Sequence, residues 1–218
     1  GYFGTRNADV GLDALDVFGN AVALNAAGDR MAVGVAYDDG TSGVSTDNYG
    51  AVYLFSFTDG NFSGGTHLGT IGQGYGADAG KPANIDMADH VDWGIGSGLD
   101  ANDNFGSSVS LNAAGNRLAV GAVYDDGFGN PGAIASNSGA VYLFTFDHDS
   151  QFVGGSLSAT IGYDYSGAND LALPTVAGQN DAFGRSVALN AKGDRLAAGA
   201  FADDGFGADG VLNIGAVH

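Results

Sequence analysis

Alternating side chains along residues 139–146 predict a β-strand that is covered on both sides. One face of this segment carries Val141 and Leu143, and the other carries one tyrosine and two phenylalanines, because successive side chains of a strand point to opposite faces. Residues 51–57 repeat the pattern. A strand with two apolar faces belongs to a sheet between two other layers, as in the stacked blades of a β-propeller.

An internal repeat accompanies this pattern. The tetrapeptide Asp-x-Phe-Gly occurs at residues 16–19, 103–106 and 181–184, and each copy precedes two short apolar segments joined by a glycine-containing turn. Such self-similarity is typical of repeat architectures, although the three phenylalanines are further apart than the roughly 40–50 residues of a common propeller blade. Each unit therefore carries additional loop.

Four candidate strands are recognised in the second copy, at residues 107–112, 117–123, 139–146 and 156–161. The link between the first two predicts a tight hairpin, in which Gly115 supplies the positive φ that such turns require. Each unit is therefore predicted to be a four-stranded antiparallel meander.

The predicted fold class is all-β, with β-propeller-type blades in about three units that are incomplete at both ends. The expected divisions are residues 1–15 for the tail of a preceding repeat, 16–102 for unit 1, 103–180 for unit 2 and 181–218 for an incomplete unit 3.

Composition supports this class and excludes others. All 25 acidic residues of the 218-residue chain are aspartates, and 39 residues are glycine, which favours turns and strands over helices. A formal net charge of −18 with only seven basic residues argues against binding to nucleic acid or to an anionic membrane. The chain has no cysteine, so its fold depends on no disulfide.

The motifs resemble a known family. Phe-Gly, then Leu-Ala-Val-Gly-Ala at residues 118–122, then Gly-Ala-Val-Tyr-Leu-Phe at residues 139–144 resemble the FG-GAP repeat of integrin α-subunit propellers and many bacterial surface proteins. The fourth-strand segment at residues 154–162 is similar to the long-repeat variety in large bacterial exported proteins that resemble filamentous haemagglutinins. The resemblance implies a propeller and an extracellular role.

Calcium-binding FG-GAP blades carry an Asp-x-Asp-x-Asp-Gly-type loop between their first two strands. The corresponding hairpins here, at residues 25–29, 112–116 and 190–194, are short and poor in carboxylates, whereas calcium prefers roughly six to eight oxygen ligands. The calcium role is therefore not transferred to these hairpins.

An Asp-Asp-Gly sequence follows the second strand of every unit. Adjacent carboxylates beside a glycine turn can chelate a hard cation such as calcium, or they can form hydrogen-bonded Asx-type turns on a solvated rim. Both interpretations stay open at this point. The candidate metal ligands are Asp38, Asp39, Asp125, Asp126, Asp203 and Asp204.

Arginine recurs at one repeat position. Arg30, Arg117 and Arg195 supply three of the seven basic residues, so we expect each to pair with a repeated aspartate as a structural latch between blades. The expected partners are the Asp-x-Phe-Gly aspartates Asp16, Asp103 and Asp181 or the aspartates of the Asp-Asp-Gly turns.

One unrepeated segment, residues 86–93, gathers three aspartates, His90 and the single tryptophan, Trp93. It could form a metal or sugar-stacking patch, or Trp93 could cover an edge of the core while His90 is solvated. No Gly-x-Ser-x-Gly or His-Glu-x-x-His motif is present, so the chain is expected not to be an enzyme.

We therefore expect a secreted or cell-surface repeat segment of a large bacterial protein that acts in adhesion or as a structural element. Two alternatives remain: a self-assembling filament or sheath subunit completed by neighbouring copies, and a calcium-assisted glycan-binding module. The expected partners are a protein or glycan receptor or copies of the chain itself, without nucleic acid or membrane insertion.

Overall fold

The computed structural model describes residues 10–41, 47–76, 80–88, 98–127, 137–147, 151–173, 180–203 and 215–217. Within these ranges it contains strands and no helix. Unit 1 comprises β1 (Phe18–Leu24), β2 (Arg30–Val35), β3 (Ala51–Ser56), β4 (Thr66–Gly72) and β5 (Ile85–Asp86). Unit 2 comprises β6 (Phe105–Leu111), β7 (Arg117–Ala122), β8 (Ala140–Thr145), β9 (Ser156–Tyr163) and β10 (Leu171–Leu173). Unit 3 comprises β11 (Phe183–Leu189), β12 (Leu196–Ala200) and β13 (Ala216–Val217).

Each unit forms its own sheet, and the strands follow one another in chain order across it. The first four strands of units 1 and 2 pair antiparallel, as the hairpin pattern predicts. Glycine closes the first hairpin of every unit with positive φ, at Gly28, Gly115 and Gly193. The all-β prediction of propeller-like blades in about three units is confirmed, and the described sheets do not close into a ring.

A fifth strand extends the sheets of units 1 and 2 beyond the predicted meander. β5 pairs with β4, and β10 pairs with β9, both in parallel. Asn84 holds the returning chain in unit 1, because its Oδ1 accepts a hydrogen bond of 2.9 Å from the backbone N–H of Thr70. Asp170 makes the equivalent contact with Thr160 at 2.7 Å in unit 2. These strands are two and three residues long, too short for hydrophobic alternation to reveal.

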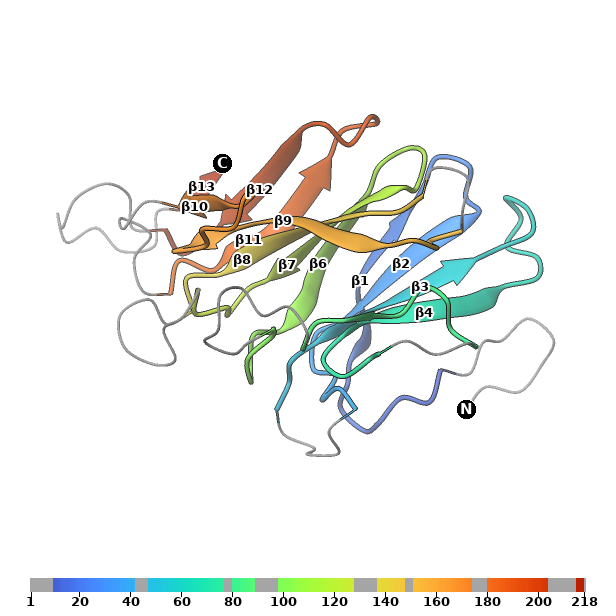
Figure 1. The fold of residues 1–218 in the computed structure, drawn as a ribbon, viewed down its shortest axis with the longest axis horizontal. Coiled ribbons are helices and arrows are strands. Elements are labelled where there is room, and N and C mark those ends of the chain that lie inside the picture. Colours follow the sequence, from blue (N-terminus) through green and yellow to red (C-terminus); the bar gives the residue numbers. More distant parts are fainter. Residues whose placement is uncertain are drawn as a thin grey trace, which may run out of the picture.

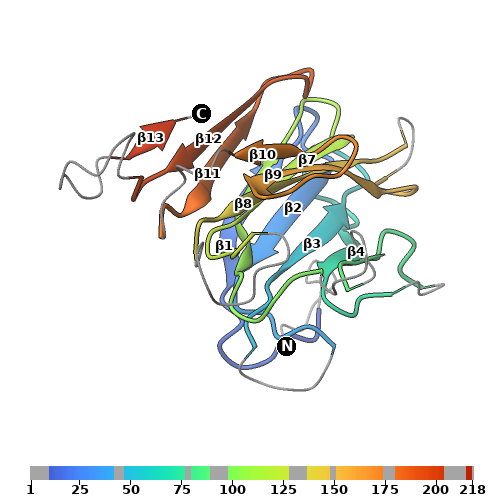
Figure 2. The same cartoon turned by 60° about the vertical axis from the view of Figure 1, so that its left-hand side comes forward.

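The three sheets stack face to face like the leaves of a fan. Figure 1 shows them side by side, from blue and cyan β1–β4 through β6–β9 to red β11–β13, and Figure 2 shows the same order after rotation. β6 packs against β1 and β2, and β11 packs against β6 and β7. Unit 2 is therefore covered on both faces.

Each interface between units has its own apolar core. The aromatic face of β8, with Tyr142 5% and Phe144 0% exposed, packs in one core with Val52 and Leu54 of unit 1. The opposite face of β8 packs through Val141 in a second core with unit 3. The prediction that this strand is covered on both sides is confirmed.

In units 2 and 3, Phe-Gly clamps the unit to the backbone of the preceding one. Phe105 N–H donates to the carbonyl of Tyr49 at 2.9 Å, and Gly50 forms a parallel β-bridge with Phe105. The Phe105 ring packs edge-on against Tyr142 of its own unit, with ring centroids 5.5 Å apart. The backbone thus contacts one blade while the side chain fills another.

Glycine is required where these backbones meet. A Cβ on Gly34 would overlap the carbonyl of Gly106, and Gly106 itself has a φ of 88° beside the carbonyl of Ala51. The next interface repeats the arrangement, with Gly121 against Gly184. Each contact between units therefore has two parts. One unit supplies the glycine of its second strand, and the next unit supplies its Phe-Gly.

We predict that Gly121→Ala strongly destabilises the chain. The new methyl group would press on the carbonyl of Gly184, and overpacking of this kind costs about 1–3 kcal/mol of unfolding free energy. The melting temperature should fall by roughly 2–4 °C for each kcal/mol lost.

Gly199→Ala is the matched control, because Gly199 occupies the same position in unit 3 with no described unit beyond it. A Cβ on either glycine meets a serine Oγ, at 2.5 Å for Gly121 and 2.6 Å for Gly199. The two substitutions therefore differ only in whether the new methyl group also presses on the Phe-Gly backbone of a following unit. Equal melting temperatures for both variants in dilute solution would contradict the assignment.

Candidate functional site

Two sets of predicted aspartates meet at one end of each sheet. The chain before β1 and the chain after β2 are joined there, since Tyr37 N–H donates to the carbonyl of Asp16 at 3.3 Å. Tyr124 and Asp103 repeat this contact at 3.2 Å in unit 2. The Asp-x-Phe-Gly and Asp-Asp-Gly sequences, predicted in different roles, therefore form a single acidic end in units 1 and 2.

The first aspartate of Asp-Asp-Gly accepts hydrogen bonds from a pair of tyrosines. In unit 1, Tyr53 on β3 donates to Asp38 Oδ2 at 2.9 Å, and Tyr75, which follows β4, donates to Asp38 Oδ1 at 2.9 Å. The two hydroxyl oxygens are 3.2 Å apart. Gly40 N–H completes an Asx-type turn on Oδ1 at 2.9 Å.

Unit 2 builds the same network in a more enclosed position. Tyr142 donates to Asp125 Oδ2 at 2.6 Å, and Tyr165 contacts both carboxylate oxygens at 3.0 and 3.2 Å. Gly127 N–H donates to Oδ1 at 2.7 Å. A buried carboxylate needs such donors, because an unsatisfied charge in the interior is costly. The network ties the second, third and fourth strands of a unit together.

Burial governs the titration of these groups. It raises the pKa of Asp125, against the opposing effect of the tyrosine and Gly127 donors. Burial and the neighbouring charge of Asp125 raise the pKa of Asp103 well above its usual range. Burial also raises the pKa of Tyr142 and Tyr165, so their hydroxyls stay protonated and donate.

The second aspartate of each turn anchors the following loop. Asp39 Oδ1 accepts from Asn48 N–H at 2.9 Å, and Asp126 Oδ1 accepts from Asn137 N–H at 2.6 Å. The two carboxylates of each turn thus serve different donors, as the Asx-turn interpretation requires.

In unit 3, Asp203 accepts from Gly215 N–H through its main-chain carbonyl at 2.9 Å, whereas Asp204 lies outside the described residues. Across the described ranges, no group of three or more histidine or acidic side chains is arranged to hold a metal ion. Calcium binding stays a prediction.

The arginines lie at the opposite end of the sheets, which contradicts the predicted Arg–Asp pairs. Arg30 pairs with Ser56 beside the first hairpin, whereas Asp16 precedes β1 and Asp38 follows β2. Strands of six residues separate the two ends by roughly 20 Å, further than a guanidinium reaches. Arg195 follows the unit 3 hairpin, while Asp181 precedes β11.

The arginines contact the next hairpin instead. Arg30 Nη1 is 3.4 Å from the carbonyl oxygen of Gly115, and the aliphatic stem of Arg117 lies against Gly193. The repeated arginine therefore bridges successive units through main chain and side-chain packing rather than through an ion pair.

Unit 1 carries a polar groove beside its acidic end that the sequence did not reveal. Its walls include Asp13, Tyr75, Lys81 and Asn84, and its volume is about 580 Å³. The His67 ring is stacked on Tyr53, with centroids 5.1 Å apart. The sequence does contain one sign of this groove, which is a departure from the repeat. His67 pairs with β3 in unit 1, whereas the corresponding residue that pairs with β8 in unit 2 is Leu157.

Two further contacts set the protonation of His67. Lys81 Nζ lies 2.9 Å from Nδ1, and Nε2 lies 3.0 Å from the carbonyl oxygen of Gly69. Burial and the positive charge of Lys81 lower the pKa of His67 to about 4. The imidazole is therefore neutral at physiological pH, with Nδ1 accepting and Nε2 donating.

The unrepeated segment proposed as a metal or sugar patch is structural where it is described. Asp86 Oδ1 accepts from Gly74 N–H and Ala88 N–H, each at 2.8 Å, and Met87 is fully buried. His90 and Trp93 lie outside the described residues.

We predict that Asp103→Asn stabilises the chain at neutral pH. Because the folded pKa of Asp103 is raised, its contribution to stability is complete below the unfolded pKa and is lost as the pH rises through the folded pKa. In the unmodified chain, Asp100 N–H donates to Asp103 Oδ2 at 2.7 Å, and the side-chain oxygen of an asparagine can accept the same hydrogen bond. The melting temperature should rise at pH 7.5, and the gain should disappear near pH 4.

Asp59→Asn provides the control of opposite sign. Asp59 is exposed, and backbone hydrogen bonds from Ser63 and Asn61 lower its pKa, so this variant should lose stability at pH 7.5. A lower melting temperature for Asp103→Asn at that pH would contradict the proposed cost of the buried charge.

We predict that His67→Leu makes stability less sensitive to acid. The unfolded chain binds a proton at His67 below about pH 6.5, whereas the folded chain excludes it until about pH 4, so folding weakens as the pH falls through that window. Leucine fits the same position in unit 2. Melting curves at pH 7 and pH 4.5 test this, and an NMR titration of His67 near pH 6.5 would contradict it.

No membrane-spanning helix of sufficient length and hydrophobicity occurs in the described part of the chain. No curated protein matches the chain. Residues 95–144 match the family model of the FG-GAP repeat, which includes the Phe-Gly clamp and the third strand of unit 2. The same clamp forms again in unit 3, and the same sheet forms in unit 1, so the match supports FG-GAP-like repeats in this chain.

Proposed function

We propose that this chain is a non-catalytic extracellular repeat segment of a large bacterial surface or matrix protein, acting in adhesion or as a structural element. The proposal rests on the observation that the repeated residues have structural roles. Phe-Gly, its glycine counterpart and the Asp–Tyr–Tyr network all hold strands or units together. Repetition therefore preserves a scaffold, and variable loops on a rigid scaffold are where binding residues concentrate.

Family and charge support an extracellular location. FG-GAP repeats are typically extracellular domains, and the net charge of −18 disfavours nucleic acid and anionic membrane surfaces as partners. The proposed partner is a protein or glycan receptor on a surface.

The unit 1 groove favours a glycan as the ligand. It combines tyrosine rings with Asn84, Lys81 and Asp13, and aromatic faces beside hydrogen-bonding groups suit a sugar ring with its hydroxyls. Calcium would add to this second candidate function by bridging sugar hydroxyls to the exposed Asp13 in the groove wall.

A glycan and matrix-protein array tests the proposal directly. The purified chain should bind one class of surface ligand saturably, without altering it, and Asn84→Asp should weaken glycan binding by adding charge to the groove. Asp170 occupies the corresponding site in unit 2, so the variant should fold. Asn61→Asp in an exposed loop is the matched control, and each array is run with calcium and with a chelator.

Two results would contradict the proposal. Chemical turnover of a bound glycan or peptide would show an enzyme. A chain that binds no ligand and whose units unfold separately at low force, rather than together through their shared cores, would contradict both the adhesive and the structural role.

A further inference from the structure

The outer face of β1 exposes residues whose counterparts in unit 2 are buried. Phe18 is 41% exposed, whereas Phe105 is 0% and Phe183 is 3% exposed. Leu24 is 43% exposed, against 8% for Leu111. Among the described residues, units 2 and 3 have a preceding sheet against this face and unit 1 does not. We call this surface of β1 the head face.

The far side of unit 3 shows the complementary exposure. Phe201 is 60% exposed, against 5% for Val123 of unit 2. This surface of β12 and β13 is named the tail face.

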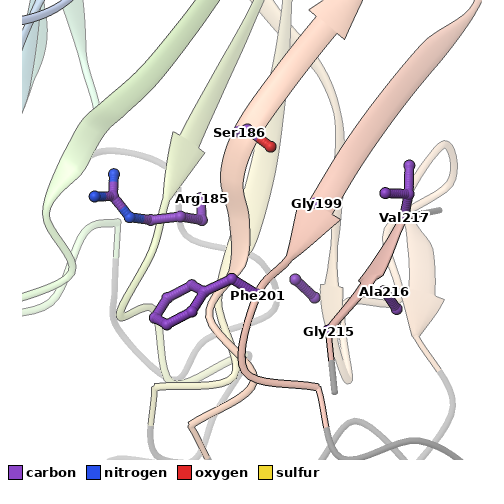
Figure 3. Close-up of a pocket in the computed structure, with 8 residues that line it drawn as sticks. Arg185, Ser186, Gly199, Phe201, Gly215, Ala216 and Val217 are labelled. Carbon is purple, nitrogen blue, oxygen red and sulfur yellow. The ribbon is translucent and has the colours of Figure 1, made fainter. Parts of the chain in front are cut away.

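The tail face contains a groove of about 480 Å³ (Figure 3). Its walls are Arg185, Ser186, Gly199, Ala200, Phe201, Gly215, Ala216 and Val217. Figure 3 shows Gly199 on β12, between Ser186 on β11 and Val217 on β13.

The repeat identifies what this groove is shaped to hold. In unit 2 the counterparts of Gly199 and Gly215 are Gly121 and Gly139, and the backbone of Phe183 and Gly184 lies against them. In unit 1 the same positions contact Phe105 and Gly106. Gly199 and Gly215, by contrast, meet atoms of unit 3 alone among the described residues. The groove is thus a Phe-Gly slot without its insert.

We propose that the Phe18-Gly19 segment of a second copy of this chain docks into this slot, so that copies associate head to tail. The head face already has the required backbone, because Gly19 has a φ of 90°, close to the 88° of Gly106 and the 81° of Gly184. The proposed contact would reproduce an interface that forms twice within the chain. This inference concerns assembly and stands apart from adhesion.

The hairpins supply a second point of register. Ala26 N–H donates to the carbonyl of Ala113 at 3.1 Å, and Ala113 N–H donates to Ala191 at 3.0 Å. The next bond in this series runs from Ala191 N–H to the Ala26 carbonyl of the docked copy. Because head and tail are different surfaces, the contact is heterologous, and it builds a ring or an open filament according to its rotation.

Two blocking variants test the proposal by sedimentation velocity across a concentration series. Val22→Asp places a charge on the head face at a side chain that is 55% exposed. Ser186→Ala with Gly199→Ala places a methyl group in the slot, and unit 1 already has Ala21 at the serine position. The unmodified chain should form dimers or longer species with rising concentration, and each variant should sediment as one chain.

Mixing the two blocking variants gives the decisive result. One retains the tail face and the other retains the head face, so the mixture should form a 1:1 dimer and nothing larger. Tyr124→Asp is the control, since Tyr124 is 44% exposed even though units lie on both sides of it; this variant should assemble like the unmodified chain. Circular dichroism confirms that every variant is folded.

A disulfide trap detects the contact even when it is weak. The chain has no cysteine, so Ala26→Cys and Ala191→Cys can be made separately, mixed and oxidised; they should cross-link far faster together than either does alone. Within one chain, Ala26→Cys with Ala113→Cys calibrates the geometry, because hydrogen-bonded neighbours lie within disulfide reach.

Three outcomes would overturn the proposal. The unmodified chain could stay monomeric at all concentrations with no mixed cross-link. Association could survive both blocking variants. It could also be abolished by one blocking variant and unaffected by the other, which would indicate a symmetric head-to-head or tail-to-tail contact.

Discussion

Close approach of main chain to main chain between adjacent sheets is the constraint on which the fold depends. Where the carbonyl of Gly106 meets Gly34, no side chain can intervene, so the sequence must supply glycine on both sides. The bulge at Phe105 then turns its ring back onto β8, where it fills the aromatic core. Main-chain contact fixes the spacing of the sheets, and the apolar side chains between them provide most of the stabilisation.

At the acidic end, the scaffold must accommodate a buried carboxylate. Asp125 is enclosed where three strands converge, and the hydroxyls of Tyr142 and Tyr165 replace the water that its carboxylate loses. The neighbouring Asp103 accepts a hydrogen bond from the backbone N–H of Asp100, and burial and the charge of Asp125 raise its pKa. Order at this end is therefore obtained against charge repulsion, whereas order at the hairpin end comes from asparagine side chains that accept turn N–H groups and from arginine stems.

Much of the fold could be predicted because its signals are local. Alternation along residues 139–146 and the recurrence of Phe-Gly both report burial and spacing directly. The predicted arginine partners were wrong, and the sequence already held the reason. Arg30 begins the second strand of a hairpin and Asp16 precedes the first strand, so antiparallel pairing separates the two residues by a strand length. Tyr75 was missed because it joins Asp38 through a fold-back of 37 positions, which no local pattern encodes.

The exposed apolar faces of units 1 and 3 and the high net charge affect association between copies at different distances. Repeat proteins gain stability from contacts between neighbouring units, so units 1 and 3, each covered on one face among the described sheets, lack one interface that unit 2 has. A charge of −18 opposes random collision between copies, but its repulsion is screened beyond roughly 8 Å at physiological salt. Contact through the slot acts at shorter distances and requires a matching glycine. Charge thus suppresses unspecific association of the apolar faces, while shape leaves one specific arrangement available.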